Sequence, residues 1–145
     1  MEPYSRQASV RWSGTGQRSK SLAYKPNSGL QMTATSTGVG IKPVGVNPPE
    51  LIAAAHAGSF ALTLANVLAQ AGYRPRQIDT TSTVMMEHVP KGWTLTQVHL
   101  DVTARVPKAA ECDFVDAALQ AKAHCPISRA LNANISMRAK LEPNL

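Results

Sequence analysis

The residue whose type and position most clearly suit chemical reactivity is Cys125, which lies in the segment Ala-His-Cys-Pro-Ile-Ser at residues 123–128. A proline directly after it is typical of the first turn of a helix, so Cys125 is expected at the N-cap. The positive end of the helix dipole lowers the pKa of a thiol there and favours the nucleophilic thiolate. The alternative is that Cys125 is a small buried side chain without a chemical role, as free cysteines often are.

The second cysteine, Cys112, is interpreted as structural. Glu111 and Asp113 flank it, and their negative charges oppose formation of a thiolate. If one helix spans residues 109–124, about 20 Å separates the two cysteines, which excludes a disulfide between them. Two cysteines in 145 residues do not indicate a secreted disulfide scaffold, so we expect a reducing, cytoplasmic location. The first residues also lack the apolar run of a signal peptide.

The four histidines do not indicate a metal site. No pair of them shows zinc-motif spacing together with Cys, Asp or Glu, and each is interpreted as a polar or core residue. The glycine-rich segment 38–45 does not match the phosphate-binding glycine patterns. We therefore expect neither a metal nor a cofactor.

A long helix is predicted from Pro48 to about Gly72. Asn47 is expected at the N-cap, Glu50 completes a capping box with it, and Gly72 is typical of the position after a helix. The polar residues inside it are spaced 3, 4, 3 and 4 and share one stripe: His56, Ser59, Thr63, Asn66 and Gln70. This polar stripe faces either solvent or a pocket, and the remaining surface is apolar, which is typical of a central helix.

Strands are predicted on both sides of this helix, from alternation of apolar and polar residues. They lie at residues 8–12, 22–24, 30–34, 78–87, 93–106 and 134–141, with turns at 13–16 and 89–92 and a loop at 38–45. Further helices are predicted at residues 109–124 and from Cys125 onward. Runs of strands without strict β-α-β alternation indicate an α+β class with largely antiparallel sheets. We expect a single domain over residues 1–145, strand-rich at 1–44 and with the long helix, hairpin and last strand at 45–145.

The net charge of +6 is concentrated in the first third of the chain, where residues 1–42 hold six Lys or Arg and one Glu. The aromatic residues Tyr4, Trp12 and Tyr24 could stack on bases, but they lie on the apolar face that a sheet buries. We therefore expect a solvated basic face and no nucleic-acid partner. An adaptor that holds nucleic acid or an acidic protein through residues 1–42 is an alternative from another functional class.

The long helix also bears on membranes and on assembly. Residues 51–71 carry no charge, yet many of them are alanine or polar, which is too little hydrophobicity for a membrane span. A helix apolar on nearly all sides is hard to cover within one small domain. We expect a homodimer with this helix near the interface and no membrane insertion.

Several short motifs lie in register over roughly residues 45–141. They are Asn-Pro-Pro-Glu-Leu-Ile-Ala-Ala-Ala-His-Ala-Gly-Ser-Phe at 47–60, Ala-Gly-Tyr at 71–73, Ile-Asp-Thr-Thr at 78–81, Val-Pro at 106–107 and Ala-Lys-Ala-His-Cys-Pro-Ile-Ser at 121–128. Together they resemble the osmotically inducible protein C (OsmC) family, which includes the organic hydroperoxide resistance (Ohr) proteins.

The resemblance implies an OsmC-like fold, with antiparallel sheets wrapped around long central helices in an intertwined homodimer. It also implies thiol-dependent reduction of a small organic hydroperoxide in the oxidative and osmotic stress response. In active members, a peroxidatic cysteine on the central helix attacks the peroxide, and a resolving cysteine in the Cys-Pro motif then forms a disulfide. A dithiol reductant opens that disulfide, while an Arg and a Glu polarise the thiolate and the peroxide.

This chain departs from the family pattern where the chemistry takes place. Ser59 occupies the position of the peroxidatic cysteine, and only Cys125, at the resolving position, matches. The catalytic Glu of the family directly follows Asn-Pro, where this chain has Pro49, and Glu50 comes one residue later. A serine hydroxyl stays protonated near neutral pH and has no accessible sulfenic acid state.

The arginine of the family is missing as well. No arginine lies between Arg18 and Arg74, and the loop that should supply it offers only Lys42. We therefore expect the two-cysteine peroxidase activity to be lost or weak. Two alternatives are a one-cysteine thiol peroxidase or thiol-transfer protein that uses Cys125, and a non-catalytic protein that binds an apolar ligand at the dimer interface.

Overall fold

The strands pair into one seven-stranded sheet in the computed structural model, which describes residues 2–15, 19–26, 31–35, 38–42 and 48–143. They are β1 (Tyr4–Thr15), β2 (Ser19–Pro26), β3 (Gln31–Thr35), β4 (Gly38–Lys42), β5 (Gln77–Val89), β6 (Gly92–Arg105) and β7 (Asn134–Leu141). Their order in the sheet is β4-β3-β2-β1-β5-β6-β7. Neighbouring strands are antiparallel except β6 and β7, which are parallel.

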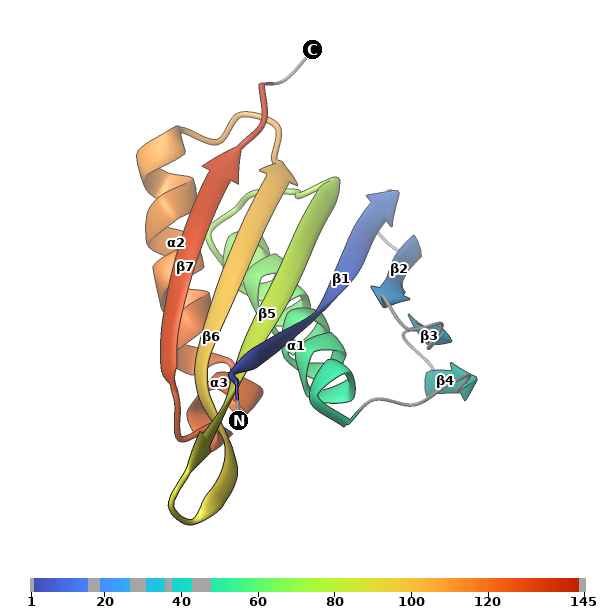
Figure 1. Cartoon of the computed structure of the whole chain (residues 1–145). Coiled ribbons are helices and arrows are strands. Elements are labelled where there is room, and N and C mark those ends of the chain that lie inside the picture. Colours follow the sequence, from blue (N-terminus) through green and yellow to red (C-terminus); the bar gives the residue numbers. More distant parts are fainter. Residues whose placement is uncertain (1, 16–18, 27–30, 36–37, 43–47, 144–145) are drawn as a thin grey trace.

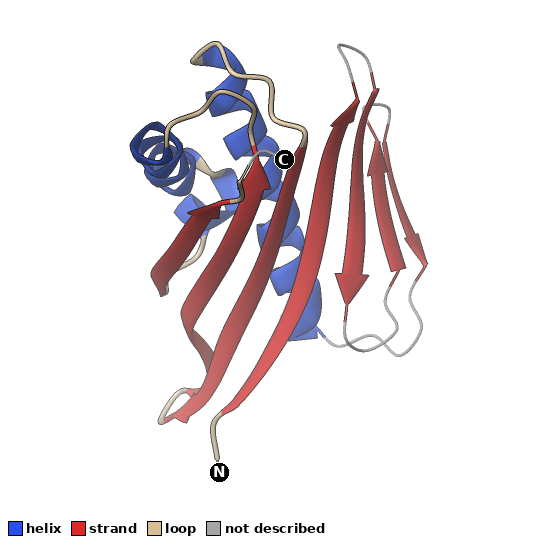
Figure 2. Ribbon diagram, turned by 90° about the horizontal axis from the view of Figure 1, so that it is seen from above, coloured by secondary structure: helices blue, strands red, loops and turns tan. Residues whose placement is uncertain are grey.

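The helices lie on one face of this sheet (Figures 1 and 2). They are α1 (Pro48–Gln70), α2 (Glu111–His124) and α3 (Pro126–Ala130). The long helix α1 packs against β1 and β5, α2 packs against β7, and both α2 and α3 contact α1. The strand β2 still contacts α1, and β3 and β4 extend the sheet beyond the helices (Figure 1). The mixed sheet with helices on one side is the predicted α+β architecture.

Two sequence predictions about the N-terminal strands were wrong. The segment 38–45 was predicted as a loop, but Gly38–Lys42 forms β4 and pairs with β3. Because a ladder needs only backbone N–H and C=O groups, glycines at the edge of a sheet do not prevent pairing. The turn predicted at residues 13–16 also begins too early, since β1 continues to Thr15 and residue 16 lies outside the described residues.

The core lies between α1, α2 and the covered face of the sheet. Over residues 77–84 of β5 the side chains alternate between buried and partly exposed positions, and the same alternation marks the second half of β6. Phe60, Leu64 and Leu68 on α1 and Phe114 on α2 are fully buried against these strands. One covered face explains why the two-residue periodicity was readable from the sequence.

The long helix begins and ends close to the predicted residues. Pro48 is its first residue, and the predicted N-cap Asn47 lies outside the described residues. At the other end, the amide of Tyr73 donates to the carbonyl of Leu68 (2.9 Å), and that of Gly72 donates to Ala69 (3.0 Å). These two bonds form a Schellman motif, which needs a left-handed residue, and Gly72 has φ +93°.

By length and composition α1 could cross a membrane, but 56% of its most apolar window is buried inside the fold. It is the core helix that the sequence predicted.

The described basic side chains of β1 lie on the exposed face of the sheet. Arg11 makes two contacts with the carboxylate of Asp79 on β5, at 2.8 and 3.3 Å, while 61% of its side chain stays exposed. Hydrogen bonding and charge attraction from Asp79 raise the pKa of Arg11. The guanidinium of Arg6 lies 4.7 Å from the centre of the Tyr4 ring. These positions agree with a solvated basic face.

We predict that Leu64→Ala lowers the free energy of unfolding by about 2–5 kcal/mol, because it leaves a cavity beneath α1. The matched control is Leu119→Ala on α2, whose side chain is 52% exposed and should change stability by less than about 0.5 kcal/mol. Urea unfolding of the two variants measures both values. Equal losses would contradict the position of the core.

Candidate functional site

Cys125 joins two helices. Its amide donates to the carbonyl of Ala121 (2.8 Å) and so ends α2, while its carbonyl accepts from the amide of Arg129 (3.0 Å) in α3. It is the N-cap residue of α3, with Pro126 directly after it, as the sequence predicted. The thiol is fully buried.

Ser59 on α1 faces this thiol. The Sγ of Cys125 lies 3.3 Å from the Oγ of Ser59, within hydrogen-bond distance for sulfur. The backbone carbonyl of Ser59 accepts a hydrogen bond from the hydroxyl of Thr63 (2.8 Å). Two residues 66 positions apart in the chain are therefore in direct contact through α1 and α3.

Two further side chains complete a polar cluster that sequence reasoning did not identify. The Nε2 atom of His56 lies 2.7 Å from the Oγ of Ser128, and both side chains are buried. His56 precedes Ser59 by three residues, and Ser128 follows Cys125 by three. A spacing of three residues places each pair on one helix face. This spacing was the sequence signal from which the cluster could have been predicted. We call His56, Ser59, Cys125 and Ser128 the thiol cluster.

The cluster changes the acidity of the thiol. Burial by itself raises the pKa of Cys125, but hydrogen bonds from the side chains of His56 and Ser59 and from the backbone and hydroxyl of Ser128 outweigh it. Together they lower the pKa of Cys125 from 9.0 to about 6. Hydrogen bonds to a charged form stabilise that form, so Cys125 is largely a thiolate at neutral pH.

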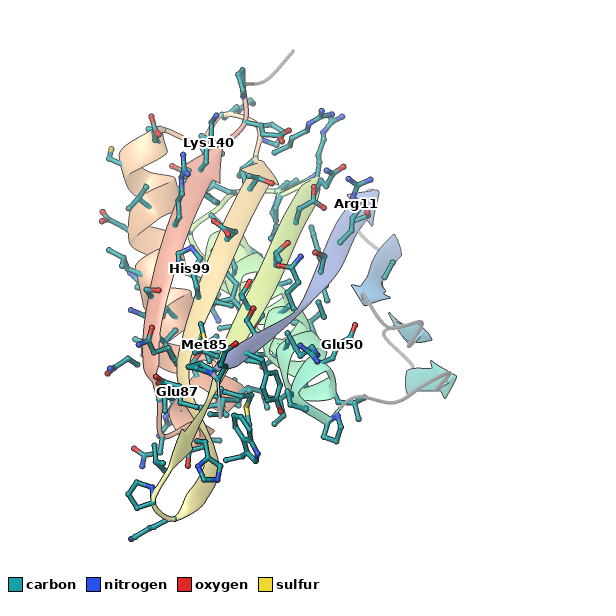
Figure 3. The ribbon with its side chains drawn as sticks, in the orientation of Figure 1. Arg11, Glu50, Met85, Glu87, His99 and Lys140 are labelled. Carbon is teal, nitrogen blue, oxygen red and sulfur yellow. The ribbon has the colours of Figure 1, made fainter. Side chains whose placement is uncertain are left out.

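Glu50 lies away from the thiol cluster. It is buried in the first turn of α1 (Figure 3), nine residues before Ser59, which corresponds to about 13 Å along the helix axis. Pro49 directly precedes it in the sequence.

Cys112 is exposed near the start of α2, at the opposite end from Cys125, and both cysteines are free. The carboxylate of Asp113 lies beside the Cys112 thiol, as expected from the sequence. Among the described residues, no group of three His, Cys, Asp or Glu side chains could hold a metal ion.

The polar stripe of α1 is buried in the core at one end and lines a pocket at the other. His56 is fully buried, whereas Thr63, Asn66 and Gln70 line a pocket of about 490 Å³ between α1 and α2. Leu62, Val67, Gln120, His124 and Pro126 complete its lining, and the last two residues flank Cys125. A larger pocket of about 1010 Å³ also lies beside the C-terminal half of α1, where Ala65 and Ala69 line it, and no residue of the thiol cluster lines it.

The pKa of Cys125 predicts how stability depends on pH. A thiol whose pKa is lower in the folded state stabilises the fold fully above its unfolded value near 9 and loses this contribution as pH falls toward 6. The free energy of unfolding of the wild type, relative to Cys125→Ala, should therefore rise between pH 6 and pH 9. The rise has an upper limit of about 1.4 kcal/mol per unit of pKa difference.

Urea unfolding at several pH values measures this difference, and titration of all other groups cancels between the two proteins. A difference that stays constant with pH would show that Cys125 titrates at its ordinary pKa.

Comparison with known proteins relates this chain to a family. The family model described as "OsmC-like protein" matches residues 40–140. Peroxiredoxin OsmC of Escherichia coli (strain K12) is 39% identical over 98 residues, which cover 68% of each chain.

Solved structures share the fold. An OsmC-like protein of unknown function from Vibrio cholerae has a TM-score of 0.60 and 14% identity, over 96% of this chain and 99% of that one. An organic hydroperoxide resistance protein from Elizabethkingia anophelis has a TM-score of 0.54 and 21% identity, over 93% and 96%. This chain belongs to the OsmC-like protein family.

Proposed function

We propose that this chain is an OsmC-like protein of the thiol-dependent hydroperoxide reductase family that has lost the two-cysteine peroxidase cycle. One observation carries the proposal. The side chain 3.3 Å from the Cys125 thiol is the hydroxyl of Ser59, where the cycle needs a second sulfur. The related Escherichia coli protein is named a peroxiredoxin, so the fold is one that serves peroxide chemistry.

The chemistry of the cycle explains why the hydroxyl matters. A thiolate attacks a peroxide oxygen, the O–O bond breaks, and the products are a sulfenic acid and, after proton uptake, an alcohol. A second thiolate then attacks the sulfenic acid sulfur, forms a disulfide and releases water after proton uptake. Ser59 cannot take either role, because its hydroxyl is not a thiolate nucleophile and cannot be oxidised to a sulfenic acid. Cys112 cannot replace it, since about 20 Å along α2 separates it from Cys125.

The residues expected to polarise the peroxide are altered too. Pro49 stands at the position of the family glutamate, and Glu50 lies about 13 Å along α1 from Ser59. The nearest basic residue before α1 is Lys42, at the end of β4, and lysine cannot make the bidentate contact of an arginine. These changes support loss of the cycle more strongly than the serine alone does.

We propose further that the protein is a cytoplasmic homodimer. In support, α1 carries the exposed apolar residues Ile52 and Leu62, and β3 and β4 extend beyond the helices of their own chain (Figure 2). A second copy would cover both features. An apolar ligand or a small organic hydroperoxide would then bind beside Ser59 at the interface.

The proposal is tested by restoring the missing sulfur. The purified protein with its unaltered sequence should not turn over an organic hydroperoxide with dithiothreitol as the reductant. Ser59→Cys should form a disulfide with Cys125 after peroxide treatment, because the two side chains are already in contact. Mass spectrometry detects this bond, and Ser59→Ala is the matched control.

Rapid turnover by the unmodified protein would contradict the proposal. If Ser59→Cys forms the disulfide but stays inactive, the remaining defect lies in the missing glutamate and arginine.

A second candidate function uses Cys125 alone, and its lowered pKa of about 6 favours it. The thiolate would attack one oxygen of a hydroperoxide, the O–O bond would break, and the products would be a sulfenic acid and an alcohol after proton uptake. One external thiol would then form a mixed disulfide and release water. A second external thiol would free Cys125 and leave as a disulfide.

For this function, stoichiometric hydroperoxide should convert Cys125 to a sulfenic acid that dimedone traps, and mass spectrometry should locate the adduct. The reaction should follow the thiolate fraction and increase as pH rises from 5 to 7, since the pKa is about 6. Cys112→Ser should leave the adduct unchanged, whereas Cys125→Ser should abolish it. An unmodified Cys125 would eliminate this candidate.

A further inference from the structure

The pocket of about 1010 Å³ beside α1 has no role in either proposed reaction, because no residue of the thiol cluster lines it. It lies at the end of the sheet where β1 ends and β5 begins, since Ser13 pairs with Gln77 and both line the pocket (Figure 1). Pockets that bind small molecules enclose about 300–1,000 Å³ and combine apolar walls with a few polar groups. This pocket has the volume of such a site.

The inner wall of the pocket is apolar and closely packed. Trp12 on β1 is 3% exposed and lines the pocket together with Ala65 of α1 and Pro75. A Cβ atom on Gly14 would lie 2.6 Å from the Trp12 ring and 2.9 Å from the carbonyl oxygen of Pro75, so this close approach requires glycine. The amide of Gly14 also donates to the carbonyl of Arg76 (2.9 Å), which fixes the segment before β5 against the end of β1.

Three cationic residues line the same pocket, and we call Arg74, Arg76 and Lys108 the basic rim. The described residues that line the pocket include no Asp or Glu. Arg76 precedes Ile78 by two residues, and its amide donates to the carbonyl of Arg105 (2.9 Å), which continues the pairing of β5 with β6. By the two-residue period of a strand, Arg76 therefore lies on the covered side of the sheet, toward α1.

Carboxylates close to the pocket have other partners. Asp79 pairs with Arg11 and accepts from the amide of Gln77 (2.8 Å), and Asp113 accepts from the hydroxyl of Tyr73 (2.9 Å). Within the described part of the chain, no ion pair includes a residue of the basic rim. The positive charge of the rim is therefore not neutralised by a carboxylate of those residues.

Lys108 occupies a backbone position that normally requires glycine. The amide of Ala109 donates to the carbonyl of Val106 (3.2 Å), with Pro107 and then Lys108 between them, and Lys108 has φ +67°. This is the pattern of a type II turn, whose third residue is usually glycine because an L side chain is crowded there. Strained residues of this kind gather at functional sites, and this one adds a cation to the rim.

We propose that this pocket binds an amphipathic organic anion. Its apolar body packs against the wall that contains Trp12, and its carboxylate or phosphate group is held by the basic rim. A guanidinium fork matches the geometry of both groups, and a lysine adds a compact positive charge. A second copy of this chain is a poorer charge complement, because its net charge is +6. The site is independent of the proposed function, since it involves neither thiol nor peroxide.

Isothermal titration calorimetry of the full-length protein with three naphthyl compounds tests the proposal. The probes are 2-naphthoate, 2-naphthyl phosphate and the neutral 2-naphthamide, which share one ring system and differ in charge. Both anions should bind, and the amide should bind at least about tenfold more weakly, because the rim attracts only the charged groups. The tighter of the two anions identifies the preferred head group. Added salt should weaken both anions.

Matched variants locate the binding. Arg76→Gln and Lys108→Gly should each weaken the anions at least about fivefold, because each removes a charged hydrogen-bond donor. Arg138→Gln and Lys140→Gln remove the same two charges from exposed positions on β7, which do not line the pocket, and should leave affinity unchanged. Lys108→Gly should also raise the midpoint of urea unfolding, because it relieves the positive φ. A lower midpoint would contradict strain at Lys108.

Three results would overturn the site. Equal affinity for the amide and the anions would show that the pocket does not select charge, and equal effects of the rim and β7 variants would show that only net charge matters. No binding of any probe at about 1 mM would exclude the anion site, including the case in which a second copy fills the pocket. Circular dichroism verifies the fold of each variant, and Lys108→Gly decides the question if Arg76→Gln does not fold. Hydroperoxide turnover would overturn the proposed function and leave this site intact.

Discussion

Close packing of α1 against the sheet and against α2 and α3 is the constraint on which the rest of the structure depends. One side of the helix contacts β1 and β5, and another contacts α2 and α3. Small residues such as Ala53, Ala57 and Ala61 are fully buried and allow this close approach, while Phe60 and Leu64 fill the space beneath the helix. The thiol cluster lies across the contact of α1 with α3, so its geometry depends on this packing.

Much of the fold could be predicted because one face of the sheet is covered. Alternation over residues 98–106 and 78–84 indicates strands, since burial on one side selects apolar residues at every second position. Gly38–Lys42 shows no such pattern, and its pairing with β3 arises from backbone groups that leave little trace in the side chains. The positions of Ser59 and Cys125 were predictable from the family resemblance, not from periodicity.

The His56–Ser128 contact shows what a periodic pattern cannot supply. All five polar residues of α1 share a stripe, but the stripe passes different neighbours along the helix. Near α3 it is buried, and farther along it lines a pocket with residues of α2. Sequence spacing gives the face of a helix, whereas the element that covers each turn is set by contacts between residues 72 positions apart.

The exchange of one atom changes what the contact between α1 and α3 can do. With sulfur on both sides it could close into a covalent bond, but with the Ser59 oxygen opposite Cys125 it is limited to a hydrogen bond. That hydroxyl still stabilises a thiolate, and a neutral donor does so without burying a second charge. A buried ion pair would have to offset the desolvation of both ions. The cluster therefore retains the acidity of a reactive thiol while lacking the second sulfur that would complete a disulfide.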